Sequence, residues 1–402
     1  MPSEPILSIC VPTYNRKQKL ERNVSFHLDA FRRLGVSFEI VIVDDCSSDG
    51  TSEFLASLAQ FPEVKPHRRI KNSGFVDNYA FAMRRAQGKY AVFLGDDDLL
   101  IPEKVVAYIE KMEADPRIGM VQAPWLCVDE REGKGPLGPF YNIPANARFM
   151  KGDFGALMQF ILDFHVFPEF MIIRREVLAR SISSPCPFIF WAFLYTARAL
   201  THADILFLPE PFARVTAISA DPRRQQGHTE TMFQWDRYRG GIEYLVSLAH
   251  EGSQRKLEER TALAESINRF MLVREKVALR LHVNAQNWVE AYILYHRIAA
   301  YEPAPLEAKT FARICQMAGL ATAAAEAANY RTNPVVVDPS INDEVLGILK
   351  PELRERLVRP ADALKNNETE SNAYLRIDPA FPPTVLPGDA IFDVSDYMAQ
   401  FI

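Results

Sequence analysis

Short apolar runs alternate with amphipathic segments along the first quarter of the chain. The run at 6–12 is rich in β-branched residues and breaks into polar ones, as a buried strand does before a loop. The next segment places Leu20, Val24 and Leu28 at helical spacing and stops at Gly35, as helices commonly do. This alternation predicts parallel strands sandwiched by helices, with a site at the carboxyl ends of the strands. The expected strands are 6–12, 38–45, 64–70 and 90–98, and the expected helices are 19–35, 46–61 and 76–88.

Beyond the first quarter of the chain, the alternation of apolar runs and amphipathic segments gives way to a loop and then to helical segments. A further helix is expected at 103–115 and a strand at 118–128. The stretch 130–144 is predicted to be a loop; its GKGPLG has dinucleotide-motif spacing, but a proline lies inside it and no helix pattern follows. From 220 onward four segments have helical periodicity, and the end of the chain is rich in proline. We therefore expect an α/β domain at 1–219, a helical domain at 220–330 and an extended C-terminal tail at 331–402.

Composition and charge narrow the class of protein. With 402 residues, of which 48% are hydrophobic and 24% charged, the chain is globular and long enough for more than one domain. The formal net charge of -5, with acids and bases mixed, gives no broad basic surface for nucleic acid. The five cysteines are odd in number and far apart, which argues against a disulfide framework and favours a reducing cytoplasm. We expect neither a signal peptide nor a membrane-spanning stretch.

Three adjacent carboxylates, Asp96, Asp97 and Asp98, follow the apolar run of the fourth expected strand. Like charges this close repel one another, so a chain rarely places them after a buried strand unless something cationic offsets them. A divalent metal that also holds phosphate oxygens is one such partner. The alternative is a cluster that caps the helix expected at 103–115.

Four polar motifs accompany the expected strands in a fixed order. They are SICVPTYNR (8–16), IVIVDDCSSDGT (40–51), NSG (72–74) and FLGDDDLLIPEK (93–104). In order and spacing they resemble the inverting nucleotide-sugar glycosyltransferases of family 2, which have the GT-A fold, and the similarity spans 6–215. The triplet with Leu94 and Gly95 resembles in particular the abequosyltransferase-like branch of O-antigen assembly. The resemblance implies a Rossmann-like, mainly parallel sheet with helices on both faces, followed here by an α-helical C-terminal domain.

The resemblance assigns the aspartate triplet to the diphosphate of a nucleotide sugar. Asp97 is the implied metal ligand, Asp96 faces ribose or metal, and Asp98 is a secondary ligand. Gly95 stands where the family's DXD motif has its first acid. Mg²⁺ or Mn²⁺, held by carboxylates and phosphate oxygens, would stabilise the negative charge on the leaving diphosphate.

The remaining motifs are implied to bind the nucleoside. In the family the loop after the first strand contacts base and ribose, so Thr13 and Tyr14 inherit those roles, and Asp44 accepts a hydrogen bond from base or ribose. The alternative for Tyr14 is packing, and the alternative for Asp45 is capping of the next helix. The implied nucleotide-sugar residues so far are Pro12, Thr13, Tyr14, Asn15, Asp44, Asp45, Asn72, Gly74 and Asp96.

An inverting transfer also needs a general base that takes the proton of the acceptor hydroxyl. The resemblance places the family's acidic pair at Phe190 and Trp191, so the expected acids are missing. The apolar stretch 185–195 is better explained as a buried helix. The nearest acids are Glu169 and Asp163, and we take Glu169 as the first candidate base; a surface or salt-bridged Glu is the alternative.

A loop at 218–235 follows the expected closing strand. In many relatives a segment here closes over the diphosphate, which Arg223 and Arg224 would suit by charge. His228 is a candidate further metal ligand, with a surface histidine as the alternative.

Together these features predict a metal-assisted glycosyltransferase that moves a hexose or deoxyhexose from a nucleotide-sugar donor to a glycan or lipid-linked glycan acceptor. It would act in the cytoplasm, with peripheral association at the inner membrane face, and its helical domain would shape the acceptor site or mediate homodimerisation. The missing acidic pair keeps a non-catalytic nucleotide-sugar-binding or assembly protein open. A sugar nucleotidyltransferase is disfavoured, because TYNRKQ after the first strand has no glycine to bind a triphosphate.

Overall fold

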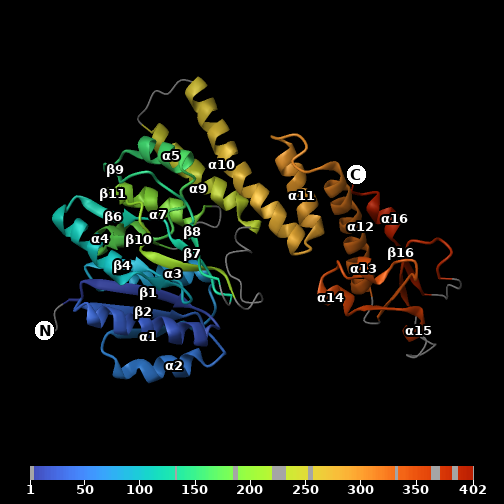
Figure 1. Ribbon diagram of the computed structural model, residues 1–402, viewed down its shortest axis with the longest axis horizontal. Coiled ribbons are helices and arrows are strands. Elements are labelled where there is room, and N and C mark those ends of the chain that lie inside the picture. The colour runs from blue at the N-terminus through green and yellow to red at the C-terminus, as the bar shows by residue number, and fades with distance from the viewer. Residues whose placement is uncertain are drawn as a thin grey trace. The chain divides into compact units, whose positions relative to one another are not determined.

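The computed structural model describes most of the chain, namely residues 4–131, 134–183, 189–219, 232–251, 257–330, 334–363, 372–382 and 388–401. Within these residues the chain folds into two compact units (Figure 1). The first unit holds the described residues up to 219 together with Gln234–Phe270. The second unit holds 232–233 and the described residues from Met271 onward.

A mixed sheet forms the centre of the first unit. In spatial order its strands are β3 (Val64–Arg68), β2 (Phe38–Asp44), β1 (Leu7–Thr13), β4 (Tyr90–Phe93), β10 (Met171–Arg174), β6 (Ile118–Gln122), β11 (Asp204–Phe207) and β9 (Ala147–Phe149). Neighbours from β3 to β4 are parallel. By contrast, β10 is antiparallel to both β4 and β6, and β9 is antiparallel to β11, so the sheet is less parallel than expected.

Helices cover both faces of this sheet. They are α1 (Lys17–Arg33), α2 (Thr51–Ser57), α3 (Phe75–Arg84), α4 (Pro102–Ala114), α6 (Arg175–Ser181) and α7 (Trp191–Leu200). Because crossovers between parallel strands are right-handed and the path reverses between β3 and β4, α3 lies on the face opposite to α1 and α2. In agreement, α1 contacts α2 and α4, whereas α3 and α7 contact α6. The GT-A-like α/β fold class expected from the sequence is confirmed.

A smaller sheet flanks the first one. Its strands are, in spatial order, β5 (Leu99–Leu100), β12 (Ala213–Ile218), β7 (Leu126–Asp129) and β8 (Pro136–Pro139). The single strand expected at 118–128 is wrong, because β6 and β7 lie in different sheets. Pro124, which has no N–H to continue a ladder, separates them. The loop expected at 130–144 also contains β8, which pairs with β7.

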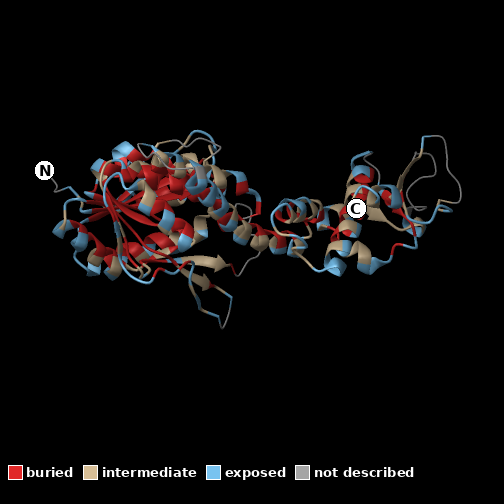
Figure 2. Ribbon diagram, turned by 90° about the horizontal axis from the view of Figure 1, so that it is seen from above, coloured by how far each residue is buried: buried red, intermediate tan, exposed pale blue. Residues whose placement is uncertain are grey.

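The core of the first unit is centred on the parallel strands. Every residue of β1, β2 and β4 is buried, which Figure 2 shows as a red centre between helices whose outer faces are exposed. The apolar runs that predicted these strands are therefore the runs that fill the core. The unit is completed by the 3-10 turn η1 (Leu58–Gln60), by α5 (Phe154–Asp163) and α9 (Trp235–His250), and by the first part of α10 (Leu257–Asn284).

The second unit continues from α10. It contains α11 (Trp288–Ala299), α12 (Ala308–Tyr330) and α16 (Val394–Met398), with the short helices α13 (Asp343–Leu346), α14 (Pro351–Arg354) and α15 (Pro360–Ala363). The four helical segments expected from 220 onward are thus confirmed as α9 to α12.

The described residues of 331–402 differ from the extended tail that we expected. They form a parallel sheet of β14 (Leu357–Val358), β13 (Val335–Val337), β15 (Ala373–Arg376) and β16 (Ala390–Asp393), in this spatial order. The helix α12 packs on β15 and β16. These strands are only two to four residues long, so no periodicity could build up in the sequence, and the prolines between them dominated its pattern.

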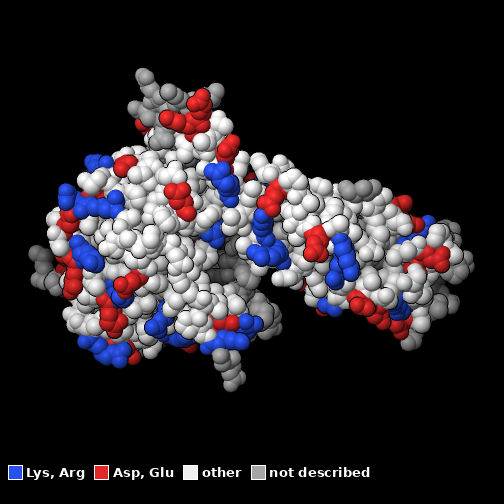
Figure 3. Space-filling model, turned by 45° about the horizontal axis from the view of Figure 1, so that its top comes forward, with Lys and Arg blue, Asp and Glu red and all other residues white. Residues whose placement is uncertain are grey.

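The surface carries charges of both signs, and the described helices can be checked for membrane-spanning character. On the face that Figure 3 shows, Lys and Arg are interspersed with Asp and Glu. Among the described helices, none combines the length and apolar character that a membrane crossing requires.

Candidate active site

The aspartate triplet lies where the order of the parallel strands reverses. From β1 the chain moves outward to β2 and β3 and then returns to β4 on the other side of β1. The carboxyl ends of the strands beside such a reversal are the usual ligand site of sheets of this kind. Thr13 ends β1, and Asp96 follows β4 by three residues. The Thr13 hydroxyl donates a hydrogen bond of 2.7 Å to Asp96 Oδ2, so the two loops meet.

Two cations face the acidic pair at this point. Arg16 Nη1 lies 3.1 Å from Asp96 Oδ1 and 2.8 Å from Asp97 Oδ2. Lys19 Nζ lies 2.8 Å from the same Asp97 oxygen. Sequence reasoning missed both cations, although the repulsion within the triplet called for positive charge and both residues follow the first strand closely.

The two acids of this pair differ in their titration. Burial raises the pKa of Asp96 to about 6, against the opposing pull of Arg16. Burial also works against the charged form of Asp97, but Arg16 and Lys19 outweigh it and the pKa of Asp97 is lowered. Asp97 is therefore the member of the pair that holds its negative charge most firmly.

Asp98 is held by another strand. Its Oδ1 accepts a hydrogen bond from the Thr216 backbone N–H in β12. Burial, followed by repulsion from Asp97, raises the pKa of Asp98 well above its ordinary range. Its Oδ2 folds back over Gly95, where an added Cβ would lie 2.5 Å from that oxygen. Gly95, which has no Cβ, therefore leaves room for the Asp98 carboxylate.

The helix α1 fixes the aspartate loop from one side. Asn23 Nδ2 donates to the carbonyl oxygens of Gly95 and Asp98 at 3.1 and 2.8 Å. One turn further along, His27 Nε2 accepts a hydrogen bond of 3.1 Å from the Leu100 N–H. Burial lowers the pKa of His27 to about 4, so the ring is neutral at pH 7 and can accept that bond.

The loop after β1 holds the residues expected to contact base and ribose. Pro12 and Thr13 are buried at the end of the strand, whereas Tyr14 is 45% exposed. Asn15 has a positive φ of 52° and accepts a hydrogen bond from the Ser48 N–H, which ties this loop to the loop after β2. An exposed ring on a fastened loop suits contact with a planar base better than packing does.

Asp44 and Asp45 at the end of β2 are engaged by the protein itself. Asp44 is fully buried, and its Oδ1 accepts from the Ser47 N–H at 3.0 Å. Asp45 accepts from the N–H groups of Ser73 and Gly74 and thereby shapes the third motif; it does not cap α2.

Asn72 and Gly74 lie in this third motif at the start of α3. Asn72 Oδ1 accepts from the Gly74 N–H at 2.9 Å, and Gly74 has a φ of +84° with no atom within 4 Å of where a Cβ would be. The positive φ requires glycine here, and the open space leaves the backbone accessible. Asp45, Asn72 and Gly74 therefore form one loop at the same edge of the sheet as Asp96.

Glu169 lies at this edge as well. The antiparallel register between β10 and β4 places Ile172 opposite Val92, and from there one strand leads back to Glu169 while the other leads on to Gly95. The residue is half-buried. Burial first, and the Glu169 carboxylate among the further causes, raise the pKa of both Tyr79 and Tyr141. The Glu169 carboxylate therefore lies near these two phenols.

Asp163 and the aromatic pair at 190–191 are in other environments. Asp163 ends α5, is exposed, and accepts a hydrogen bond of 2.7 Å from Gln159. Phe190 and Trp191 are buried as expected, and Trp191 packs against Tyr79 with ring centroids 4.6 Å apart. The helix expected over 185–195 is observed as α7, which begins at Trp191. Arg223, Arg224 and His228 lie outside the described residues.

The carboxylates fit a divalent cation that is shared with a ligand. Asp96 and Asp97 offer the hard oxygen donors that Mg²⁺ and Mn²⁺ prefer. In the described part of the chain, however, no three His, Cys, Asp or Glu side chains come together as a metal site. A cation here would need further oxygens from a bound diphosphate and from water, which is how Mg²⁺ is usually held with nucleotides.

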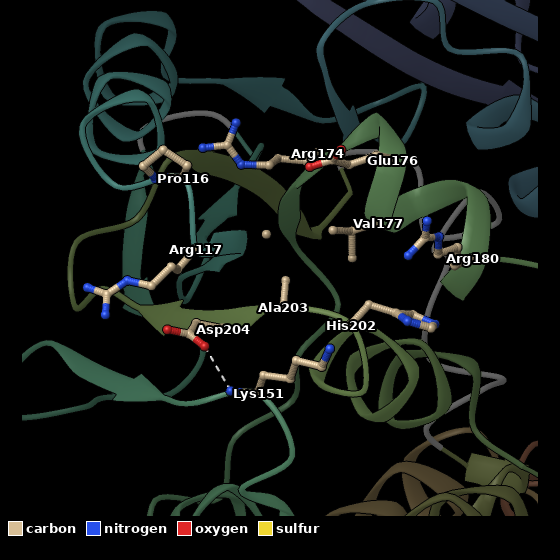
Figure 4. A pocket seen from close by; sticks show the side chains of 11 residues that line it. Pro116, Arg117, Lys151, Arg174, Glu176, Val177, Arg180, His202, Ala203 and Asp204 are labelled. Carbon is tan, nitrogen blue, oxygen red and sulfur yellow. Dashed lines mark hydrogen bonds between the residues drawn. The ribbon is translucent and has the colours of Figure 1, made fainter.

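A separate cavity lies at the other end of the strands. It has a volume of about 410 Å³ and borders the amino ends of β6 and β11. Figure 4 shows Val177 and Ala203 pointing into it, and Asp204 bound to the backbone of Lys151 at its wall. This cavity is distinct from the aspartate loop, because the two lie at opposite ends of the strands.

Comparison with known proteins agrees with this geometry. Residues 8–181 match the model of the family described as glycosyl transferase family 2. The chain is 34% identical over 110 residues to the putative teichuronic acid biosynthesis glycosyltransferase TuaG of Bacillus subtilis. It is 31% identical over 103 residues to the abequosyltransferase RfbV of Salmonella typhimurium.

These similarities are partial. The match to TuaG covers 27% of this chain and 42% of TuaG, and the match to RfbV covers 25% of this chain and 30% of RfbV. Among solved structures, residues 1-349 of S. aureus TarS in complex with UDP-GlcNAc match with a TM-score of 0.49 and 15% identity, covering 81% of this chain and 87% of that one.

Proposed function

We propose that this protein is a glycosyltransferase that moves a sugar from a nucleoside diphosphate sugar to a hydroxyl group of a glycan or lipid-linked glycan. The observation that carries the proposal is the Asp96–Asp97 pair at the strand reversal, inside the segment that matches family 2. TuaG and RfbV carry names of a teichuronic acid biosynthesis glycosyltransferase and an abequosyltransferase, which supports a product among cell-surface polysaccharides. We propose an O-antigen-type product and a hexose or deoxyhexose as the sugar.

In this proposal the donor is bound by three loops: the loop after β1, the loop that contains Asn72 and Gly74, and the aspartate loop after β4. Tyr14 contacts the base, and Gly74 lets the backbone approach the nucleoside. Asp97 would be the main ligand of a divalent cation, and Asp96 would bind the cation or the ribose. When bound, Mg²⁺ or Mn²⁺ would supply stabilisation of the negative charge that develops on the leaving diphosphate. Asp44, whose Oδ1 also accepts from the Ser47 N–H, accepts a hydrogen bond from the base or the ribose.

We propose Glu169 as the general base. It takes the proton from the acceptor hydroxyl while that oxygen attacks the anomeric carbon from the face opposite the diphosphate, which inverts the configuration. Its position just before β10, which pairs with β4 ahead of the aspartate loop, supports this role.

A non-catalytic nucleotide-sugar-binding protein is the second candidate. It is favoured by one observation: where the resemblance places the family's acidic pair, Trp191 is 5% exposed and packed among aromatic rings. Both functions predict donor binding, but only the first predicts consumption of the donor.

The test is a calorimetric titration of the full chain, with Mn²⁺, against UDP-, GDP-, CDP- and dTDP-sugars. We expect one nucleotide class to bind in a metal-dependent manner. NMR of the reaction with that donor should then show loss of the sugar nucleotide and a product of opposite anomeric configuration. Failure of every donor to bind would sink both functions, whereas binding without consumption in the presence of glycan and lipid-linked acceptors would leave the binding protein.

A further inference from the structure

The acidic pair of the candidate site already carries cations of the same chain. Asp96 and Asp97 face Arg16 and Lys19 at 2.8 to 3.1 Å. The four side chains are between 5% and 18% exposed. At this burial the charges are screened far less than those of surface pairs. Any ligand of the carboxylates must therefore displace these cations or share the carboxylates with them.

Hydrogen bonds from other residues also hold the aspartate loop. Asn23 holds the carbonyls of Gly95 and Asp98, and Thr216 holds the Asp98 carboxylate, all through hydrogen bonds. These fastenings involve neither Arg16 nor Lys19. The cations are thus placed to balance charge, in addition to whatever packing they provide.

The charge balance suggests two arrangements of the same groups. In the structure two carboxylates face two cations. A divalent cation on the carboxylates would add two positive charges, and a sugar diphosphate would bring about two negative ones. With both bound, repulsion is lowest when Arg16 and Lys19 turn from the carboxylates to the diphosphate, which a guanidinium fork and a flexible ammonium group both suit.

We infer that Arg16 and Lys19 hold Asp96 and Asp97 in the ligand-free protein and bind the donor diphosphate once a divalent cation has taken over the carboxylates. This inference rests on the proposed function and adds two donor-binding residues to it. It makes binding of metal and diphosphate mutually favourable, because each removes the repulsion that the other would meet. Arg16 and Lys19 then also offset the charge of the departing nucleoside diphosphate.

The test uses two probes that need no donor: Mn²⁺ alone, followed by electron paramagnetic resonance, and pyrophosphate titrated calorimetrically in the presence of Mg²⁺. In Arg16→Met the cation that competes for the carboxylates is gone, so Mn²⁺ should bind about tenfold more tightly. Pyrophosphate should bind about tenfold more weakly, because it loses a charged partner. Lys19→Met, at a more exposed position, should shift both affinities in the same directions by smaller factors.

Arg22→Met is the matched control. Arg22 lies on the same helix and pairs with Glu130 at 3.0 Å, with its own side chain 66% exposed. Its loss removes the same charge away from the aspartate loop and should leave both affinities unchanged. Thermal unfolding of each variant shows whether it is folded at the titration temperature.

The opposite signs of the two effects decide the matter. Damage to the loop would weaken Mn²⁺ and pyrophosphate together, and that result in the folded Lys19→Met variant overturns the inference. Unchanged Mn²⁺ affinity, or no pyrophosphate binding by the wild type with Mg²⁺, also overturns it. If one of these contradicting results is found in a protein that does turn over a sugar nucleotide, only this inference fails. If the Mn²⁺ and pyrophosphate affinities shift as expected but no sugar nucleotide is turned over, only the proposed transferase function fails.

Discussion

The three adjacent aspartates have two different roles in the structure. Asp97 faces two cations, and its pKa is lowered. Asp98 accepts from the Thr216 N–H, and its pKa is raised because it is buried next to Asp97. An acid that is buried and difficult to ionise is a poor ligand for a cation. The run of three identical residues therefore contains a pair suited to binding charge and one residue suited to holding the loop.

This difference predicts unequal mutants. Asp97→Asn should abolish turnover and weaken metal-dependent donor binding, because one of the few carboxylates that could balance the cation is lost. Asp98→Asn should do much less, since an amide oxygen can still accept from the Thr216 N–H. Calorimetry with Mn²⁺ and nucleotide, followed by rate measurements, checks both. Equal losses in the two variants would show that we have assigned the register of the motif wrongly.

The second prediction concerns the general base. Glu169→Gln keeps the size of the side chain but cannot take a proton, so donor and metal affinity should survive. Turnover should fall by about 10² to 10⁴-fold, the usual contribution of a positioned base. Steady-state rates at saturating donor, together with donor titrations, measure the two effects separately.

Asp163→Asn is the control for this prediction, because Asp163 is exposed and bound to Gln159. It should stay near wild-type turnover. Activity retained in Glu169→Gln with a collapse in Asp163→Asn would move the role to Asp163. Activity retained in both would place the base elsewhere in the chain or show that the acceptor needs none.

For single residues, the sequence was enough to identify the aspartate triplet but not the cations that pair with it. The triplet required a nearby positive charge, and a metal was the partner we considered. Arg16 and Lys19 could not be chosen from among the 46 Lys and Arg residues, because their contact with the triplet depends on β1 and β4 being neighbours. That pairing joins segments about 80 positions apart and is set by strand order, which no local pattern reports.

At the scale of the element, α1 carries two stripes. The apolar stripe that begins at Leu20 fills the core, as its spacing predicted. Lys19, Asn23 and His27 repeat at intervals of four residues and contact the loop 95–100. Polar residues at helical spacing next to an apolar stripe were thus a readable signal for a helix that supports a site.

His27 links this helix to the pH dependence of stability. Its pKa is about 4 in the folded protein, because burial disfavours the charged ring, against an ordinary value of 6.5. Between these values the unfolded chain binds more protons, so the free energy of unfolding falls as the pH drops below about 6.5 and levels off near 4. The expected contribution of His27 is a loss of about 2 kcal/mol between pH 7 and pH 5.

Urea unfolding of the wild type and of His27→Gln at pH 7 and pH 5 measures this contribution. Other groups titrate in both proteins, so the relevant quantity is the difference between their pH dependences. The variant is expected to be less stable at pH 7 but to lose about 2 kcal/mol less than the wild type on acidification. Parallel pH dependences would mean that the ring is not buried in its neutral form.

Elements were predictable where they are long and periodic. The helices α9 to α12 were found from their helical spacing, and the strands β1 and β2 from their apolar runs. The break between β6 and β7 was missed, because an apolar run continues through Pro124 and the change of sheet is a tertiary event. The small C-terminal sheet was missed because its strands are too short to show alternation, although the three buried valines of β13 marked its centre.

At the scale of the whole molecule, two separately packed cores are present. The core of the first unit lies around β1 and β4, and the second unit has its own core between α12 and the C-terminal sheet. Gly319 in α12 marks how closely the second core is packed, because an added Cβ would lie 2.7 Å from the Met398 Cα in α16. All the donor-binding residues of the described chain that we propose lie in the first unit.

The last prediction follows from this separation. Hydrogen exchange of the full chain with Mn²⁺ and its best-binding nucleotide sugar should show protection in the loops after β1, β2 and β4, by an amount set by RT ln(1 + [L]/Kd). The strands β13 and β15 should exchange as they do without ligand.

The variant Gly319→Ala should do the reverse. Overpacking against α16 is expected to cost about 1–3 kcal/mol and to speed exchange in α12 and β15. Donor affinity in this variant should stay at the wild-type value. Ligand protection in β13 and β15, or weakened donor binding in Gly319→Ala, would instead mean that the second unit takes part in holding the donor, and the assignment of the whole donor site to the first unit would be wrong.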